Sequence, residues 1–231
     1  MIQIPPRPPR ILVMHPDPLL SAGLVAALRE HGDFEVCLDG AGAMAEDAPP
    51  VDVVIADYAN AMRLADEAVR SGYRSLATAR VLALTSNDRE ADIRRAIEAG
   101  VRGYLLVGGP IGDLIEGVTL VARGMRYLCG SVAQRMADSL TRTALTSREI
   151  EVLQLVVSGE SNKTIARQLS IELGTVKSHM SSIMTKLGAS SRTQAAGIAA
   201  QRGLVDGSLR AQPPARLISI GPANEPLAQV A

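Results

Sequence analysis

Between residues 10 and 124 the sequence alternates short apolar runs with longer amphipathic segments, and this alternation restricts the fold of that part of the chain. The short runs lie at residues 11–14, 34–38, 53–56, 81–84 and 103–106. Continuous apolar runs of this length are typical of parallel strands that are buried on both faces. The intervening segments 19–31, 61–71, 90–99 and 111–123 carry apolar residues at helical spacing. This order predicts a doubly wound α/β domain with a five-stranded parallel sheet, whose functional site lies at the carboxyl ends of the strands.

The remaining sequence divides into a connector, a second domain and two ends. Residues 125–144 are polar and predict a helical connector, and residues 145–205 have the helical periodicity of a second domain. Residues 1–9 and 206–231 contain several prolines and little periodicity, which predicts flexible ends. No apolar stretch approaches the ~20 residues needed to cross a bilayer, and the N-terminus lacks the apolar core of a signal peptide. We therefore expect a cytoplasmic protein without membrane contacts.

Composition and charge leave the partner open. Hydrophobic residues make up 47% of the chain and charged residues 21%, as in an ordinary globular protein. The 24 basic and 24 acidic residues balance, but residues 145–210 contain eight bases against five acids. This mild positive excess is compatible with DNA binding without requiring it. Cys37 and Cys129 stand far apart and outside any metal-binding spacing, so buried thiols are expected.

The second domain begins with strong helix-start signals. Thr146 is placed to cap a helix, and Glu149, three residues later, is placed to return a hydrogen bond to it. Gly159 is expected to end this helix and Ser161 to cap the next one. After a short turn, a longer helix carries an apolar stripe of Val176, Met180, Ile183 and Leu187. A short helix, a tight turn and a longer helix predict a helix-turn-helix unit, whose second helix enters the DNA major groove.

The opposite face of that longer helix carries polar side chains that can read base edges. Lys177, Ser178 and Ser181 project together away from the apolar stripe. Lys177 can donate to guanine O6 or N7, and the two serines can donate to or accept from several bases. Lys163 and Thr175, near helix starts, suit contacts to DNA phosphates. Spacing alone leaves a second interpretation open, in which these residues are only the solvated face of an amphipathic helix.

The order of these motifs resembles the LuxR-type DNA-binding domain. The matching stretches are Leu145-Thr-Ser-Arg-Glu-Ile-Glu-Val-Leu153, Gly159-x-Ser-Asn-Lys163-x-Ile-Ala166, Thr175-Val-Lys-x-His179, Ile183-x-x-Lys-Leu187 and Arg192-Thr-Gln-Ala195. The resemblance implies a four-helix module whose third helix reads double-stranded DNA and whose fourth helix pairs two subunits. It includes His179 in the DNA-binding motif, where packing or a phosphate contact is expected. For the fourth helix we expect Ala195, Ile198 and Ala199 to form the pairing surface.

One position departs from that family. The LuxR-type domain usually has Ser at the start of the reading helix, where this chain has Glu172. A carboxylate is still favourable at a helix N-terminus, but it caps less well and faces the DNA phosphates. We therefore expect a modest affinity for DNA.

The α/β domain, which precedes this LuxR-type module along the chain, resembles the receiver of NarL/FixJ-class response regulators. Asp57, at the end of the third apolar run, matches the aspartate that accepts a phosphoryl group. Thr85 matches the hydroxyl that senses this group, and Tyr104 matches the aromatic residue that turns inward on activation. The resemblance implies a transcription regulator in which the receiver controls the exposure or the pairing of the DNA-binding module by a population shift.

The rest of the phosphorylation chemistry is missing from the expected positions. The paired acids of the family fall here on His15 and Pro16, and the family lysine falls on Val107. Phosphoryl transfer to a carboxylate depends on a Mg²⁺ ion held by carboxylates and on neutralisation of the phosphoryl charge. Asp17 comes two positions late and is expected to cap the following helix instead. We therefore expect a degenerate receiver that binds no Mg²⁺ and needs no aspartyl phosphorylation.

Two other interpretations remain open at this point. In one, Asp57 is phosphorylated by a sensor kinase, as in a conventional two-component system. In the other, the chain is an adaptor whose receiver-like domain binds a second regulator. RNA polymerase is a further expected partner of a DNA-bound regulator. An enzyme is not expected, because the chain has no nucleophile set, metal-spaced cluster or phosphate loop, and Gly108-Gly109 is typical of a turn.

Overall fold

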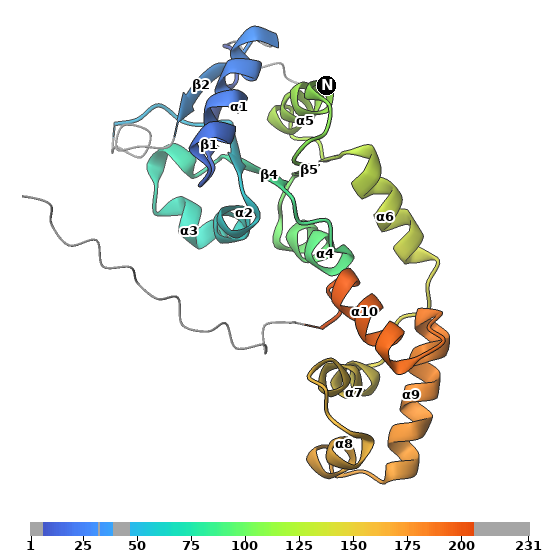
Figure 1. Ribbon diagram of the computed structural model, residues 1–231. Coiled ribbons are helices and arrows are strands. Elements are labelled where there is room, and N and C mark those ends of the chain that lie inside the picture. The colour runs from blue at the N-terminus through green and yellow to red at the C-terminus, as the bar shows by residue number, and fades with distance from the viewer. Residues whose placement is uncertain (1–6, 32, 39–46, 206–231) are drawn as a thin grey trace, which may run out of the picture.

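The computed structural model describes residues 7–31, 33–38 and 47–205 of the chain (Figure 1). An α/β domain and a helical domain are joined by helix α6 (Gly130–Leu140). Each domain has its own cluster of buried apolar side chains. The expected flexible tail at 206–231 and the first six residues of the expected flexible N-terminus lie outside the described residues. Within the described ranges, no helix combines the length and the apolar composition that crossing a membrane requires.

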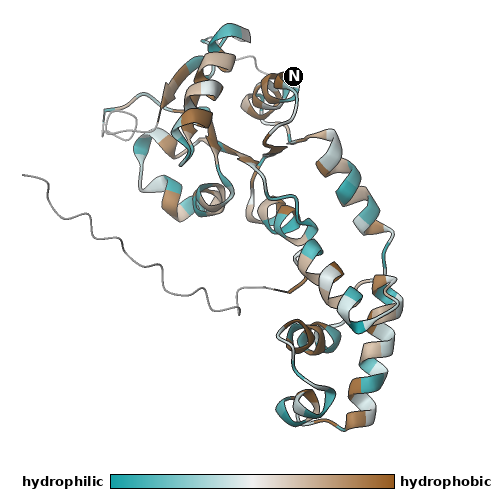
Figure 2. Cartoon of the chain, viewed as in Figure 1, coloured by the Kyte–Doolittle hydropathy of each residue, from teal (hydrophilic) through white to brown (hydrophobic). Residues whose placement is uncertain are grey.

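The sheet confirms the predicted α/β class and adds one strand to it. Its strands are β1 (Arg10–Met14), β2 (Glu35–Leu38), β3 (Val53–Ala56), β4 (Arg80–Thr85), β5 (Gly103–Leu106) and β6 (Tyr127–Leu128). All neighbours are parallel, in the order β2-β1-β3-β4-β5-β6. The short β6 comes from the segment predicted to be a helical connector, and it pairs with β5 through Gly103 and Tyr127. Figure 2 shows the strands as largely hydrophobic, as expected for a sheet covered on both faces.

Helices cover both faces of this sheet. They are α1 (Pro18–His31), α2 (Tyr58–Ala65), α3 (Glu67–Ser71), α4 (Glu90–Ala99) and α5 (Ile111–Ala122), with a 3₁₀ turn at Arg74–Leu76. The single helix predicted over 61–71 is wrong, because the chain breaks at Asp66. Asp66 has an extended backbone (φ −69°, ψ 118°), and its carboxylate accepts a hydrogen bond from the Ala68 backbone N–H at 2.9 Å. An aspartate that caps a new helix competes with continuation of the old one.

The connector is packed along α4. Val132 of α6 is fully buried in the core of the α/β domain. Arg94 of α4 donates to the Ser139 hydroxyl at 3.1 Å. Just beyond α6, Arg142 bridges to the Glu90 carboxylate at 2.8 Å. These contacts tie the connector to the domain that precedes it.

The helical domain consists of four helices around a small core. They are α7 (Ser147–Val157), α8 (Asn162–Gln168), α9 (Leu173–Leu187) and α10 (Arg192–Arg202). Leu153, Ile165 and Ile183 are fully buried between them. In Figure 1, α10 lies on the side of this domain that faces α4. A Cβ atom placed on Gly203, directly after α10, would lie 3.3 Å from the Cβ of Arg89, which precedes α4.

Candidate nucleic-acid interface and receiver site

Helices α8 and α9 form the predicted helix-turn-helix. As predicted, Ser161 caps α8, its hydroxyl accepting a hydrogen bond from the Thr164 backbone N–H at 3.2 Å. The turn at 169–172 reverses the chain with Ser170 at φ 54°, a left-handed conformation that is uncommon outside glycine. The backbone N–H of Ile171 donates to the carbonyl of Ala166 at 2.9 Å and closes this turn. The angle between α8 and α9 is therefore set by local hydrogen bonds.

The predicted base-reading residues lie together on the surface of α9. Lys177, Ser178 and Ser181 are exposed, whereas Val176 and Met180 of the same helix are buried. His179 is half-buried, and its packing or phosphate-contacting role stays a prediction. In Figure 1 the N-terminal end of α9 lies beside α8, at the end of the molecule remote from the α/β domain. Within the described residues, the α/β domain therefore leaves this face open.

The phosphate-contact candidates flank that face, and the structure adds a positioning residue that the sequence did not reveal. Lys163 and Thr175 are exposed near the starts of α8 and α9. Arg192, at the start of α10, donates to the Asn162 side-chain oxygen at 2.9 Å and to the carbonyl of Glu160. Both acceptors lie at the entry to α8, so Arg192 holds the part of the chain that presents Lys163. Sequence reasoning identified Arg192 only as a motif residue, because its partners lie about thirty positions earlier along the chain.

A buried carboxylate joins the reading helix to α7. Glu149 forms the predicted capping box, accepting from the Thr146 backbone N–H at 2.7 Å. The same carboxylate accepts from the Ser182 hydroxyl at 2.5 Å and from the Lys186 ammonium at 2.7 Å, both on α9. Burial by itself would raise the pKa of Glu149, but the hydrogen bonds from Lys186, Ser182 and Thr146 outweigh it and lower the pKa to about 2. Glu149 is therefore ionised at neutral pH and anchors α9 against α7.

The start of α9 lacks a side-chain cap, although the sequence predicted only a weaker cap from Glu172. Glu172 has the extended backbone of an N-cap residue (φ −73°, ψ 151°), but its carboxylate accepts no hydrogen bond from the helix. Its side chain is exposed at the end of α9 that would approach DNA.

Replacing Glu172 by Ser is expected to strengthen DNA binding and to stabilise the helical domain by about 1 kcal/mol. The serine hydroxyl can cap the first turn, and loss of the carboxylate removes repulsion from DNA phosphates. Thermal unfolding and fluorescence-anisotropy titration with labelled duplex would measure the two effects. The Glu172→Gln variant is the control, because it removes the charge without adding a good cap. Weaker DNA binding by Glu172→Ser would contradict the prediction.

The pairing surface proposed for α10 needs a correction. Ala195 and Ala199 are fully buried in the core of their own domain, where α10 packs against α7 and α9, and Ile198 is half-buried. They cannot serve a partner subunit without opening that core. The exposed side of α10 carries Thr193, Gly197 and Gln201 instead, at four-residue spacing. The sequence could not separate these two sides, because small residues occur on both.

The receiver residues meet at the carboxyl ends of the strands, as predicted for an α/β domain. A cavity of about 440 Å³ is lined by residues that follow β1, β3, β4 and β5 or end them: His15, Asp17, Asp57, Thr85 and Val107 among others. The structure therefore brings together the candidate phosphoacceptor, the candidate switch hydroxyl and two of the positions at which the sequence departs from the receiver pattern, His15 and Val107.

Both carboxylates of this cavity are engaged as helix caps. Asp57 accepts from the backbone N–H groups of Ala59 and Asn60 at 3.3 Å and from the Asn60 side chain at 2.6 Å. Asp17 accepts from the backbone N–H groups of Leu19 at 2.9 Å and Leu20 at 3.2 Å, which is the capping role predicted for it. Each carboxylate therefore satisfies the start of the helix that follows it.

The two candidate switch residues are linked through Asn87. The Thr85 hydroxyl is buried and accepts from the Asn87 backbone N–H at 3.1 Å. Tyr104 is fully buried, and its hydroxyl donates to the Asn87 carbonyl at 2.7 Å. Burial raises the pKa of Tyr104, so its hydroxyl remains a donor at neutral pH. The aromatic ring therefore points inward in this structure, held by its hydrogen bond to the Asn87 carbonyl.

A receiver-like α/β domain followed by a helix-turn-helix domain defines a DNA-binding transcription regulator, and comparison with known proteins agrees. The model of the luxR family of bacterial regulatory proteins matches residues 143–199. The transcriptional regulatory protein LiaR of Bacillus subtilis is 31% identical over 210 residues, which cover 85% of this chain and 99% of LiaR. The response regulator VraR of Staphylococcus aureus is 31% identical over 206 residues, covering 85% of this chain and 98% of VraR. The chain therefore belongs to the response regulators of the NarL/FixJ class.

Solved structures agree on the fold. The RcsB response regulator of Salmonella typhimurium superimposes with a TM-score of 0.63 at 20% identity, over 83% of this chain and 99% of RcsB. A structure of RcsB dimers bound to DNA gives a TM-score of 0.58 at 17% identity, over 84% of this chain and 99% of that one. At these identities the likeness concerns the arrangement of helices and strands.

Proposed function

We propose that this chain regulates transcription as a DNA-bound dimer and that its receiver works without conventional aspartyl phosphorylation. The observation that carries the proposal is the set of side chains around Asp57. The cavity at Asp57 is lined by His15, Asp17 and Val107, and none of its described lining residues is a lysine or an arginine. A phosphoryl group on Asp57 would lack the cation that normally neutralises it.

The carboxylates of the Asp57 pocket also argue against the binding of the Mg²⁺ ion that phosphorylation requires. Mg²⁺ prefers a rigid octahedral set of oxygen ligands, usually including carboxylates. At the positions after β1, this chain offers a histidine and a proline, and the Asp17 carboxylate is hydrogen bonded to the start of α1. We propose that the Asp57 pocket binds Mg²⁺ too weakly to support phosphoryl transfer.

Incubation of the full chain with Mg²⁺ and acetyl phosphate is expected to leave its mass unchanged. Intact-mass spectrometry measures this directly, and a triple variant with His15→Asp, Pro16→Asp and Val107→Lys is the matched control, because it restores the acids and the lysine. The triple variant is expected to gain one phosphoryl group, and Asp57→Ala in that background should abolish it. Stoichiometric phosphorylation of the wild-type chain on Asp57 would overturn the proposal and favour control by a sensor kinase.

The same structure supports control through subunit pairing. Among the described residues, the face of α9 with Lys177, Ser178 and Ser181 is exposed, whereas the end of α10 approaches the start of α4. The solved RcsB complex contains dimers on DNA, and the LuxR-type resemblance assigns pairing to the helix that corresponds to α10. We propose that the exposed side of α10, with Thr193, Gly197 and Gln201, pairs two chains on DNA and that the receiver regulates this pairing. RNA polymerase contact by the bound dimer stays a prediction.

A further inference from the structure

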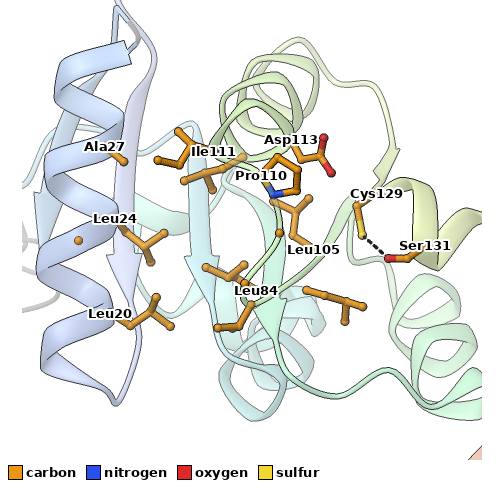
Figure 3. A pocket seen from close by; sticks show the side chains of 16 residues that line it. Leu20, Leu24, Ala27, Leu84, Leu105, Pro110, Ile111, Asp113, Cys129 and Ser131 are labelled. Carbon is orange, nitrogen blue, oxygen red and sulfur yellow. Dashed lines mark hydrogen bonds between the residues drawn. The ribbon is translucent and has the colours of Figure 1, made fainter.

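A second cavity lies in the receiver between α1 and α5 (Figure 3). Its volume is about 260 Å³. Leu20, Leu24 and Ala27 of α1 form one wall, and Leu84 and Leu105 of the sheet lie opposite. Leu20 is also part of the wall of the Asp57 pocket, so the two cavities adjoin.

Glycines keep this cavity open. Gly23 on α1 and Gly108 and Gly109 in the loop after β5 all line it. A Cβ atom added at Gly23 or Gly108 would meet nothing within 4 Å. A larger residue would therefore have room at position 23, whereas Gly108 has φ +88°, which strains any other residue, and a Cβ atom on Gly109 would lie 3.2 Å from the Leu106 carbonyl.

The lining is suited to an apolar guest. Val107 and Ile111 at the rim expose 44% and 51% of their surface, although both are large hydrophobic residues. Water held against such a surface gains few hydrogen bonds, so its replacement by an apolar molecule is favourable. The volume lies just below the roughly 300–1,000 Å³ of sites for drug-sized molecules, which favours a guest of about one ring with a short chain.

One charged side chain lines the cavity. Asp113 of α5 lines the cavity, is half-buried, and its carboxylate accepts no hydrogen bond from the residues that the structure describes. Cys129 and Ser131, the other polar side chains of the lining, contact each other at 3.5 Å. Within the part of the chain that the structure describes, no lysine or arginine lines the cavity. Asp113 lies in the first turn of α5, and a half-buried carboxylate without a hydrogen-bonded side-chain partner attracts a hydrogen-bond donor, most strongly a protonated amine, and repels an anion.

We infer that this cavity is a binding site for a small apolar amine, with the hydrocarbon or aromatic part between α1 and α5 and the ammonium group against Asp113. The inference is independent of whether Asp57 is phosphorylated. Because Val107 and Leu20 also line the Asp57 pocket, a guest here would contact the loop that follows β5, which in a phosphorylated receiver carries the lysine.

Three probes with the same aromatic part test the site: 2-phenylethylamine, 2-phenylethanol and phenylacetate. Titrated into the methyl-labelled full chain, the amine is expected to shift the NMR signals of Leu24, Leu105 and Ile111 with saturation. The alcohol should bind several-fold more weakly, and phenylacetate should not bind. Asp113→Asn should remove the advantage of the amine over the alcohol while leaving the alcohol bound.

A cavity-filling variant separates specific from unspecific binding. Gly23→Leu introduces a side chain into the open space, suits a helix better than glycine, and is expected to abolish binding of the amine and the alcohol. Ala22→Leu adds the same group one residue earlier on the exposed side of α1 and should bind like the wild type. Equal binding of amine and carboxylate, or binding that survives Gly23→Leu, would overturn the inference. It would also fail if no probe binds and sedimentation shows that a second copy of the chain covers the cavity.

Discussion

Replacement of Glu149 by Gln is expected to destabilise the helical domain by about 3 kcal/mol, because it removes one partner of a buried ion pair. The Glu149 side chain is 5% exposed, and the paired Lys186 side chain is 20% exposed. Gln can keep the hydrogen bond of the capping box. The loss would therefore report the contacts of the charged carboxylate with α9, which hold the reading helix in place.

The unfolding of the two domains can be measured separately. Tyr58, Tyr73, Tyr104 and Tyr127 all precede the helical domain, and the chain has no tryptophan. Tyrosine fluorescence during urea unfolding therefore follows the α/β domain, whereas circular dichroism follows both domains. Glu149→Gln should shift the circular-dichroism transition and leave the tyrosine transition in place.

A neighbouring glutamate on the same helix provides the control. Glu151 pairs with Arg148 at 2.6 Å, but its side chain is 51% exposed. Loss of an exposed pair costs at most about 1 kcal/mol, so Glu151→Gln should be nearly neutral. Equal destabilisation by both variants would contradict the role assigned to Glu149.

The pKa of Glu149 also predicts how stability depends on pH. In the folded protein the pKa is about 2, below the ordinary value of 4.5 that the unfolded chain retains. A carboxyl group with a lowered folded pKa contributes its full stability above the unfolded pKa, and this contribution is lost as the pH falls to the folded pKa. The difference between wild type and Glu149→Gln should therefore be constant above pH 4.5 and shrink as the pH falls from 4.5 to 2.

Replacement of Lys177 by Ala is expected to weaken binding to the preferred DNA site by about 10- to 100-fold, or ~1–3 kcal/mol, with little change on unrelated DNA. Lys177 lies on the exposed face of α9 beside Ser178 and Ser181. A contact to a base edge contributes to the affinity for the preferred sequence alone, because other sequences present a different pattern of donors and acceptors. The ratio of the two affinities is the quantity that should fall.

Sites for this test come from genomic fragments selected with the full chain, and anisotropy titrations over a range of salt concentrations give the affinities. Lys163→Ala is the control, since a phosphate contact supports binding to every sequence. This variant should weaken binding to specific and unrelated DNA alike. The salt dependence of the affinity should fall by about one released counterion. A Lys177→Ala variant that behaves in this uniform way would show that Lys177 contacts phosphate instead of a base.

Local sequence signals determined most of the helices and strands and the exposed face of the DNA-binding helix α9. The apolar runs predicted β1 to β5, and the caps at Thr146 and Ser161 predicted the starts of α7 and α8. The spacing along α9 separated the exposed Lys177 from the buried Val176. These properties depend on residues within a few positions of each other, so periodicity and capping reveal them.

Only the tertiary structure decided the contacts between distant segments. The short strand β6 forms because β5 offers it an edge, and Ala195 and Ala199 are buried because α7 and α9 cover them. The ion pair of Glu149 joins residues 37 positions apart, and the cavity at Gly23 exists because α1 and α5 approach without filling the space between them. Such features depend on how helices and strands pack, and a pattern of neighbouring residues does not contain that information.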